Sequence, residues 1–93
     1  LKENYIGLIA EKVRKVWRYL GAEDNWGCNV HIIQSEVGDV LAVNIQDCMI
    51  DNSDRAISFK NSIERAVYKA SPLPLAPDKD LFDNEIMFYF RVN

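Results

Sequence analysis

Residues 28–46 read CNVHIIQSEVGDVLAVNIQ, and this stretch decides the fold because it has the pattern of a β-hairpin. Residues 28–34 and residues 40–46 are rich in valine and isoleucine, the β-branched residues that favour strands. Between them, Gly38 and Asp39 predict a two-residue type II′ turn, because glycine readily takes the positive φ of the first central position. The sequence therefore predicts two adjacent antiparallel strands.

The turn also predicts which residues of the two strands lie opposite each other. It places Ile32 opposite Ile45 and Val30 opposite Asp47. Because side chains alternate between the two faces of a strand, one face is apolar and is the expected core face, with Val30, Ile32, Val43 and Ile45. The other face is mixed and carries His31, Ile33, Asn44 and Gln46. We expect His31 to be a half-exposed strand residue and not a metal ligand or a catalytic base.

Cys28 and Cys48 are the only two cysteines, so one bridge between them is the only pairing within the chain. The predicted register puts Cys28 opposite Met49, which brings both cysteines to the open end of the hairpin. Regular pairing would point their side chains to opposite faces. A bond would therefore require a β-bulge near Asp47 or a three-residue turn centred on Gly38. Two free thiols are the alternative, and no metal site is expected because too few further ligands are available.

Two segments outside the hairpin have the spacing of apolar side chains that is typical of amphipathic helices. The first covers residues 3–20, with Asn4 as the expected N-cap and Gly21 as the expected stop. The second covers residues 55–70 and ends before Pro72, because proline disfavours a helical conformation in the preceding residue. The first helix is expected to bury Tyr5, Ile6, Ile9, Val13, Val16, Trp17 and Leu20. The second is expected to bury Ile57, Ile63, Ala66, Val67 and Ala70, with Phe59 beside them.

The C-terminal part predicts a connector, a helical turn and a last strand. The connector is expected to pack through Leu73, and a single helical turn is expected over residues 78–82. Residues 85–93 alternate with a period of two, which predicts a strand. Its expected inward face carries Ile86, Phe88, Phe90 and Val92. Its expected outward face carries Met87, Tyr89 and Arg91.

The order helix-strand-strand-helix-strand predicts an α+β fold in a single domain over residues 1–93. We expect a small three-stranded antiparallel sheet with helices packed on one face. The last strand has no chain after it to cover its outer side, and an uncovered sheet edge readily pairs with another strand. We therefore expect partner binding by strand addition along Ile86, Met87, Phe88, Tyr89, Phe90, Arg91 and Val92. The alternative is that the outward residues simply face solvent on an edge strand.

Composition argues against several classes of function. The chain has 93 residues, a net charge of −3 and a pI near 5.0, which argues against nucleic-acid binding because phosphates require a basic surface. No apolar run approaches the roughly 20 residues of a membrane span, so no membrane contact by this domain is expected. The few glycines are scattered and form no phosphate-binding loop, and no nucleophile with a base is recognisable. We expect neither enzyme activity nor a cofactor.

Two stretches in the C-terminal half carry a resemblance to a known family. Residues 62–74, SIERAVYKASPLP, and residues 80–90, DLFDNEIMFYF, resemble the C-terminal domain of TolA, the cell-envelope integrity protein of Gram-negative bacteria. The first helix, the strand that begins with a cysteine and the Gly-Asp hairpin extend the resemblance over nearly the whole chain. Residues 50–53 depart from it, because the family would have a glycine-containing loop there.

The resemblance implies a non-catalytic periplasmic domain, cut from a longer protein that is anchored in the inner membrane. TolA-like proteins engage TolB and the Pal system at the outer membrane and support envelope integrity and cell division. Colicin translocation domains and the minor coat protein of filamentous phage exploit the same type of domain. A TonB-like energy-transducing domain that contacts outer-membrane receptors is the alternative. A small acylphosphatase-type enzyme is a further alternative, against which the scattered glycines argue.

The resemblance also bears on the cysteines. It implies an oxidising compartment, in which a disulfide persists. Together with the expected position of both cysteines at the same end of the hairpin, this predicts a Cys28–Cys48 disulfide. In a domain of this size the core is thin, so the bond is expected to contribute substantially to stability.

Overall fold

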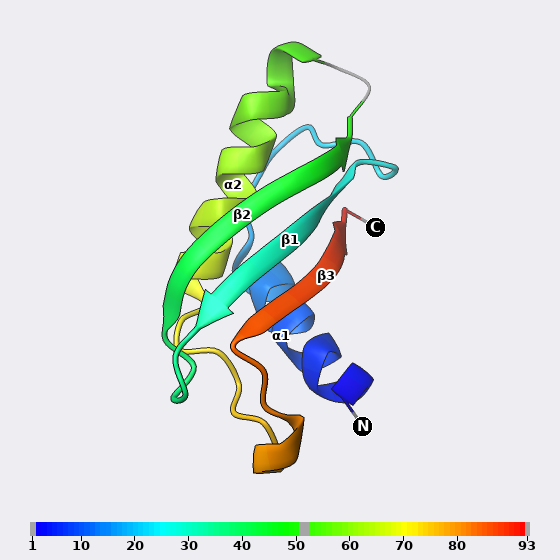
Figure 1. The fold of residues 1–93 in the computed structure, drawn as a ribbon. Coiled ribbons are helices and arrows are strands. Elements are labelled where there is room, and N and C mark those ends of the chain that lie inside the picture. Colours follow the sequence, from blue (N-terminus) through cyan, green and yellow to red (C-terminus); the bar gives the residue numbers. More distant parts are fainter. Residues whose placement is uncertain (1, 51–52, 93) are drawn as a thin grey trace.

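The computed structural model describes residues 2–50 and 53–92. It contains two α-helices and three β-strands in the predicted order, together with two short 3-10 helices (Figure 1). The elements are α1 (Lys2–Val16), β1 (Gly27–Gln34), β2 (Val40–Met49), η1 (Ser53–Arg55), α2 (Ala56–Lys69), η2 (Lys79–Leu81) and β3 (Glu85–Arg91). The α+β class is therefore confirmed. Over the described residues, neither α-helix is both long and apolar enough to cross a membrane.

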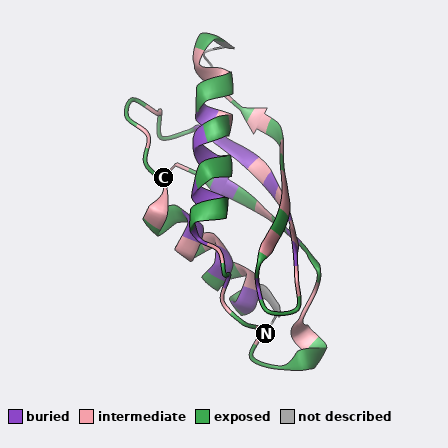
Figure 2. Ribbon diagram, turned by 90° about the vertical axis from the view of Figure 1, so that its left-hand side faces the viewer, coloured by how far each residue is buried: buried purple, intermediate pink, exposed green. Residues whose placement is uncertain are grey.

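The three strands form one antiparallel sheet in the order β2-β1-β3, so β1 is the central strand. Both helices pack on the same face of the sheet (Figures 1 and 2). β1 is largely buried as a result, and the side chains of Val30 and Ile32 have no exposed surface. β2 and β3 are the two edge strands, which confirms the edge position expected for the last strand.

The predicted register of the hairpin is wrong by two residues, although the predicted faces are right. Ile32 lies opposite Val43, and Val30 lies opposite Ile45. A shift of two residues leaves every side chain on its face, because side chains alternate with a period of two. All four residues consequently belong to the core or pack against it.

The turn explains the error in register. Instead of a two-residue turn at Gly38 and Asp39, the chain reverses over a β-turn in which the Gly38 N–H donates to Ser35 O at 3.0 Å. The Ser35 N–H donates to Asp39 O at 2.9 Å, which makes Gly38 the last residue of the loop. Gly38 has a φ of 89°, a value that favours glycine. Its carbonyl also accepts a hydrogen bond from the Leu73 N–H at 2.7 Å, so the loop contacts the connector that follows α2.

At the open end of the hairpin, β2 contains the β-bulge that was one of the two expected routes to a disulfide. Asp47 and Cys48 both lie opposite Cys28, and Asp47 has a left-handed φ of 49°. The extra residue brings Cys48 to the same face as Cys28, and the two sulfur atoms are bonded at 2.08 Å. The predicted disulfide is therefore confirmed. It lies in the core, because Cys28 is fully buried.

α1 ends at Val16, well before the predicted end at Leu20. Contacts with α2 draw the following residue out of the helical path. The Trp17 Nε1–H donates to Ser62 Oγ at 2.9 Å, and the Trp17 ring meets Phe59 edge-on. Leu20 is 92% exposed as a consequence, and the prediction that it is buried is wrong.

Three smaller predictions about the helices are also wrong. Asn4 lies inside α1 and is not its N-cap. Gly21 does not end the helix, but lies beyond it with a φ of 87°, where its carbonyl accepts a hydrogen bond from the Arg55 guanidinium. Ile57 is 73% exposed, because Phe59 takes the buried position in the first turns of α2.

The remaining C-terminal predictions hold where the structure describes them. Leu73 is buried, so the connector packs as expected. The expected helical turn is the 3-10 helix η2, and the Asp78 carboxylate caps it by accepting the Asp80 N–H. β3 ends at Arg91 and not at residue 93, which lies outside the described residues.

Aromatic rings close one end of the core. Trp26 and Trp17 both meet the Phe59 ring edge-on, with centroid distances of 5.2 and 6.1 Å. Phe90 of β3 contacts Trp17 at 5.1 Å. The Arg55 guanidinium lies over the Trp26 ring at 5.7 Å, a cation–π contact that covers the cluster. The cluster therefore joins the residue that follows α1, the residue that precedes β1, α2 and the end of β3.

Removing the disulfide should lower the stability of the domain. The double variant Cys28→Ala/Cys48→Ala opens a loop that the bond closes over a separation of 20 residues. We expect the free energy of unfolding to fall by about 3 kcal/mol, because the unfolded chain regains the freedom of that loop. Urea denaturation followed by circular dichroism measures the change. A double variant as stable as the native chain would contradict the stabilising role of the bond.

Two glycine substitutions should change stability in opposite directions. A Cβ at Gly38 would lie 2.6 Å from the Leu73 backbone oxygen, in a residue whose φ is 89°. Gly38→Ala should therefore lower the free energy of unfolding by about 2 kcal/mol. Gly7→Ala is the control, because nothing lies within 4 Å of the added Cβ, and it should raise the stability by about 0.5–1 kcal/mol. Similar unfolding midpoints for both variants would show that the contact with Leu73 is unimportant.

Candidate functional site

β3 forms one edge of the sheet and has two different faces (Figure 1). Towards the helices the side chains are buried or half-buried, as predicted: Ile86, Phe88, Phe90 and, just after the strand, Val92. The outward side chains are exposed, also as predicted: Met87, Tyr89 and Arg91. Met87 is 55% and Tyr89 42% exposed, which is unusual for large apolar side chains next to each other on one face.

Every second backbone unit of β3 points away from the sheet. The Gln34 N–H donates to Asn84 O at 2.8 Å, and the Val92 N–H donates to Trp26 O at 3.0 Å. In an antiparallel pair, such hydrogen-bonded positions alternate with positions whose N–H and C=O point outward. The pairing between β1 and β3 has no bulge, so this alternation continues along the whole strand. The outward positions are Glu85, Met87, Tyr89 and Arg91.

The two ends of this edge already have hydrogen-bond partners. At one end, the Glu85 N–H donates to Asp83 Oδ1 at 3.0 Å. At the other end, the Arg14 guanidinium of α1 donates to the backbone oxygens of Arg91 and Val92. Sequence reasoning missed both contacts. Arg14 in particular belongs to a helix face that has the pattern of a solvated surface, and it lies far from β3 in the sequence.

The middle of the edge is open. Among the described residues, no group hydrogen-bonds to the outward N–H and C=O of Met87 or Tyr89. Exposed backbone groups of this kind on a regular strand are a ready template for another strand. The candidate site is therefore this stretch, which we call the β3 edge and define as Glu85–Arg91.

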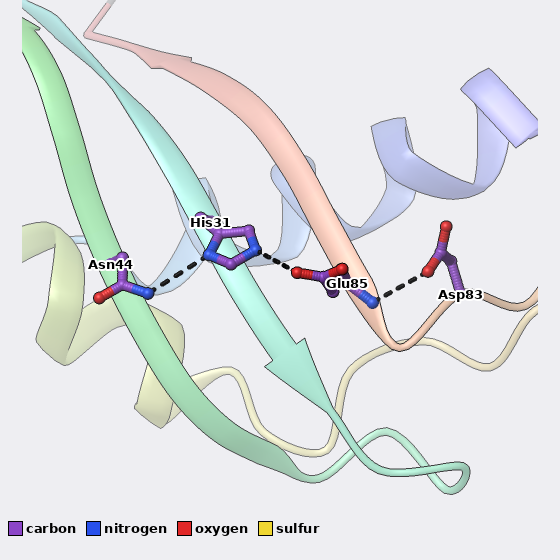
Figure 3. Close-up of polar contacts among 4 residues, drawn as sticks. All are labelled: His31, Asn44, Asp83 and Glu85. Carbon is purple, nitrogen blue, oxygen red and sulfur yellow. Dashed lines mark hydrogen bonds and ion pairs between the residues drawn. The ribbon is translucent and has the colours of Figure 1, made fainter.

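A polar chain on the open face connects all three strands (Figure 3). His31 lies on β1, between Asn44 of β2 and Glu85 of β3. The Asn44 amide donates to His31 Nδ1 at 3.3 Å, which leaves the Nε2–H to donate to Glu85 Oε1 at 3.0 Å. His31 is half-exposed, as predicted. Its contacts fix the Glu85 carboxylate over the sheet at the start of the β3 edge.

Tyr89 lies against a glycine of the central strand. A Cβ at Gly27 would lie 2.4 Å from Tyr89 Oη and 2.7 Å from the Phe90 backbone oxygen, so the ring occupies the space above the glycine. Tyr89 also lines a shallow hollow together with Asp24, Met49 and Arg91. The ring is thus held beside the edge while a large part of it remains exposed. An aromatic ring fixed in this way is a suitable contact for another side chain.

The opposite edge, on β2, is less regular. Its pairing with β1 is interrupted near Leu41 and again at the Asp47 bulge. The Val40 N–H at its start donates to Ser71 Oγ at 3.1 Å. Bulges are one of the ways in which proteins protect a sheet edge from pairing. β3 is therefore the edge with the longer uninterrupted geometry.

The described residues contain no candidate metal site, and a buried amide lies just beside the start of β3. In residues 2–50 and 53–92, no three His, Cys, Asp or Glu side chains are grouped so that they could hold a metal ion. The buried Gln34 donates from Nε2 to Tyr5 Oη and to the Asp83 backbone oxygen, both at 2.8 Å. This amide fixes the chain just before β3, so its role is to position the edge.

Removing the Arg14 guanidinium should loosen the end of β3. In Arg14→Ala the Val92 N–H, which donates to Trp26 O, should exchange with solvent roughly fivefold faster, because a hydrogen bond of this kind contributes about 1 kcal/mol. Hydrogen exchange followed by NMR measures the rate. Lys15→Ala is the control, since Lys15 is exposed and its nearest acidic contact is Glu11. Equal exchange rates in both variants would contradict the role of Arg14.

Comparison with known proteins adds no second line of evidence. No protein-family model matches the chain. A search of curated proteins found no significant match. The geometry of the β3 edge and the sequence resemblance to the TolA C-terminal domain are therefore the two indications of function.

Proposed function

We propose that this chain is a non-catalytic protein–protein interaction domain that binds an extended segment of its partner by strand addition at the β3 edge. The observation that carries the proposal is the row of outward backbone groups at Met87 and Tyr89, on a strand without bulges. An incoming strand would continue the antiparallel sheet and hydrogen-bond to these groups. Such main-chain bonds supply affinity and depend little on the partner's sequence.

Selectivity would come from the side chains around those backbone groups. On the open face, Met87 and Tyr89 would contact every second side chain of the incoming strand, because directly opposed positions lie within about 5 Å. On the helix side, the half-buried Phe88 would contact the alternate set. Arg91 and Glu85 place opposite charges at the two ends of the edge. A suitable partner segment is therefore extended, apolar at alternate positions and charged at its ends.

The biological setting that we propose follows from the resemblance to the TolA C-terminal domain. In that setting the domain lies in the periplasm, its full-length protein is anchored in the inner membrane, and it binds TolB and the Pal system to support envelope integrity and cell division. Colicin translocation domains and a phage minor coat protein would use the same domain. The Cys28–Cys48 disulfide supports an oxidising compartment, since such bonds are rare where thiols are kept reduced.

Binding of a TolB N-terminal peptide should depend on the outward N–H of Met87. Met87→Pro removes this donor and should weaken binding at least about tenfold, while the sheet stays intact because the Met87 N–H takes no part in pairing with β1. Isothermal titration calorimetry measures the affinity, and circular dichroism checks the fold. Met87→Ala is the matched control. It keeps the N–H and should weaken binding much less.

Amide chemical-shift mapping provides the complementary test. Peptide binding should shift the amide signals of residues 85–91 and of the neighbouring β1 residues. Shifts confined to the helices would refute strand addition at this edge. Equal affinities of the proline and alanine variants would do the same, because they would show that the side chain and not the backbone is recognised.

A further inference from the structure

We propose that the β3 edge is complementary to itself, so that two copies of the chain pair β3 against β3. The two strands would run antiparallel about a twofold axis at Phe88, and the two sheets would become one. This inference goes beyond the proposed function, because it needs no other protein. It rests on three properties of the edge: its end charges, its backbone groups and its side-chain order.

The charges at the ends of β3 fit a twofold pairing. The strand reads EIMFYFR over residues 85–91, with an acid at one end and a base at the other. In an antiparallel pair centred on Phe88, Glu85 lies opposite Arg91 of the second copy, and symmetry repeats the contact at the other end. Both side chains are exposed and belong to the open face. Opposite charges that face each other across two strands stabilise the pair.

The outward backbone groups meet each other in this register. Met87 lies opposite Tyr89 of the second copy, and both positions point their N–H and C=O away from their own sheet. Each such pair would exchange both hydrogen bonds. A pairing shifted by one residue would place outward groups opposite inward groups and would lose these bonds.

The ends of the edge fit the same register. Opposite Arg91 of the second copy, Glu85 would ordinarily donate its N–H to the Arg91 oxygen. Both of these groups are already hydrogen-bonded within the monomer, to Asp83 and to Arg14. The reciprocal bond, from the Arg91 N–H to the Glu85 oxygen, can still form. The pairing therefore requires neither of these two hydrogen bonds to break and leaves no backbone group of the edge without a partner.

The side chains are also complementary. On the open face, Met87 would contact Tyr89 of the second copy, a favourable pairing of a thioether with an aromatic ring. On the helix side, Phe88 would contact its own symmetry mate at the axis. This would cover the ring that is only half-buried in the monomer. Self-pairing and strand addition use the same groups, so the dimer could not bind a partner strand.

Sedimentation velocity measurements on charge-reversal variants test the pairing and its register. Across a concentration series, the native chain should pass from monomer to dimer. Glu85→Arg and Arg91→Glu should each raise the dimer dissociation constant by about tenfold or more, because two attractive pairs become repulsive. A mixture of the two variants should dimerise again, since every Arg then lies opposite a Glu. The control variants are Glu64→Arg and Arg65→Glu on the exposed face of α2, which should dimerise like the native chain.

Several results would overturn the self-pairing. One is a native chain that stays monomeric throughout the concentration series. Another is that the single variants dimerise as strongly as the native chain. The third is a mixture of the two variants that stays monomeric although circular dichroism shows that both are folded. The proposed function has a separate readout, the binding of the TolB peptide to Met87→Pro and Met87→Ala. A monomeric chain whose peptide binding is lost only in the proline variant refutes the dimer alone. A chain that dimerises as expected but binds no peptide even at concentrations at which it is monomeric refutes the proposed function alone.

Discussion

The two rows of backbone hydrogen bonds on β1 are the interactions on which the rest of the structure depends. One row holds β2 and the other holds β3. On its inner face the same strand supplies Cys28, Val30 and Ile32, all fully buried against the helices. The sheet, the core and the disulfide therefore share one strand. The edge strand β2 can contain bulges because most of the sheet's fully buried side chains belong to the central strand.

Much of the fold could be predicted because the side chains of a strand alternate between the two faces of the sheet, so that every second residue is buried. The alternation places Val30 and Ile32 on the correct face even though the predicted register is wrong by two residues. The register depends on whether Gly38 begins or ends the turn. Gly38 ends it, and its carbonyl accepts a hydrogen bond from the Leu73 N–H, a contact that the local turn pattern does not contain. The end of α1 could not be predicted for a similar reason. It depends on the hydrogen bond from Trp17 to Ser62, and local helix signals do not contain that contact.

In the candidate site, too, some features could be predicted from the sequence and others could not. The exposure of Met87 and Tyr89 followed from alternation in the last strand, and its edge position followed from the element order. The contacts that limit the edge did not follow, because Arg14 and Asp83 act on backbone atoms and have no recognisable pattern. Together they leave an edge that is open in the middle and closed at both ends. A long partner strand would have to displace Arg14 to extend past Arg91.

The position of the disulfide has a consequence for the order in which strands associate. It keeps β1 and β2 close together even in an unfolded chain, whereas β3 must find β1 across the whole of α2. The hairpin is therefore expected to form early, and β3 is expected to dock last and to detach first, because contacts distant in sequence form slowly. Detachment would uncover the row of hydrogen-bonding groups on β1 itself. A foreign strand could then replace β3 instead of extending the sheet beyond it. The disulfide does not prevent this strand exchange, because it links β1 to β2 and not to β3.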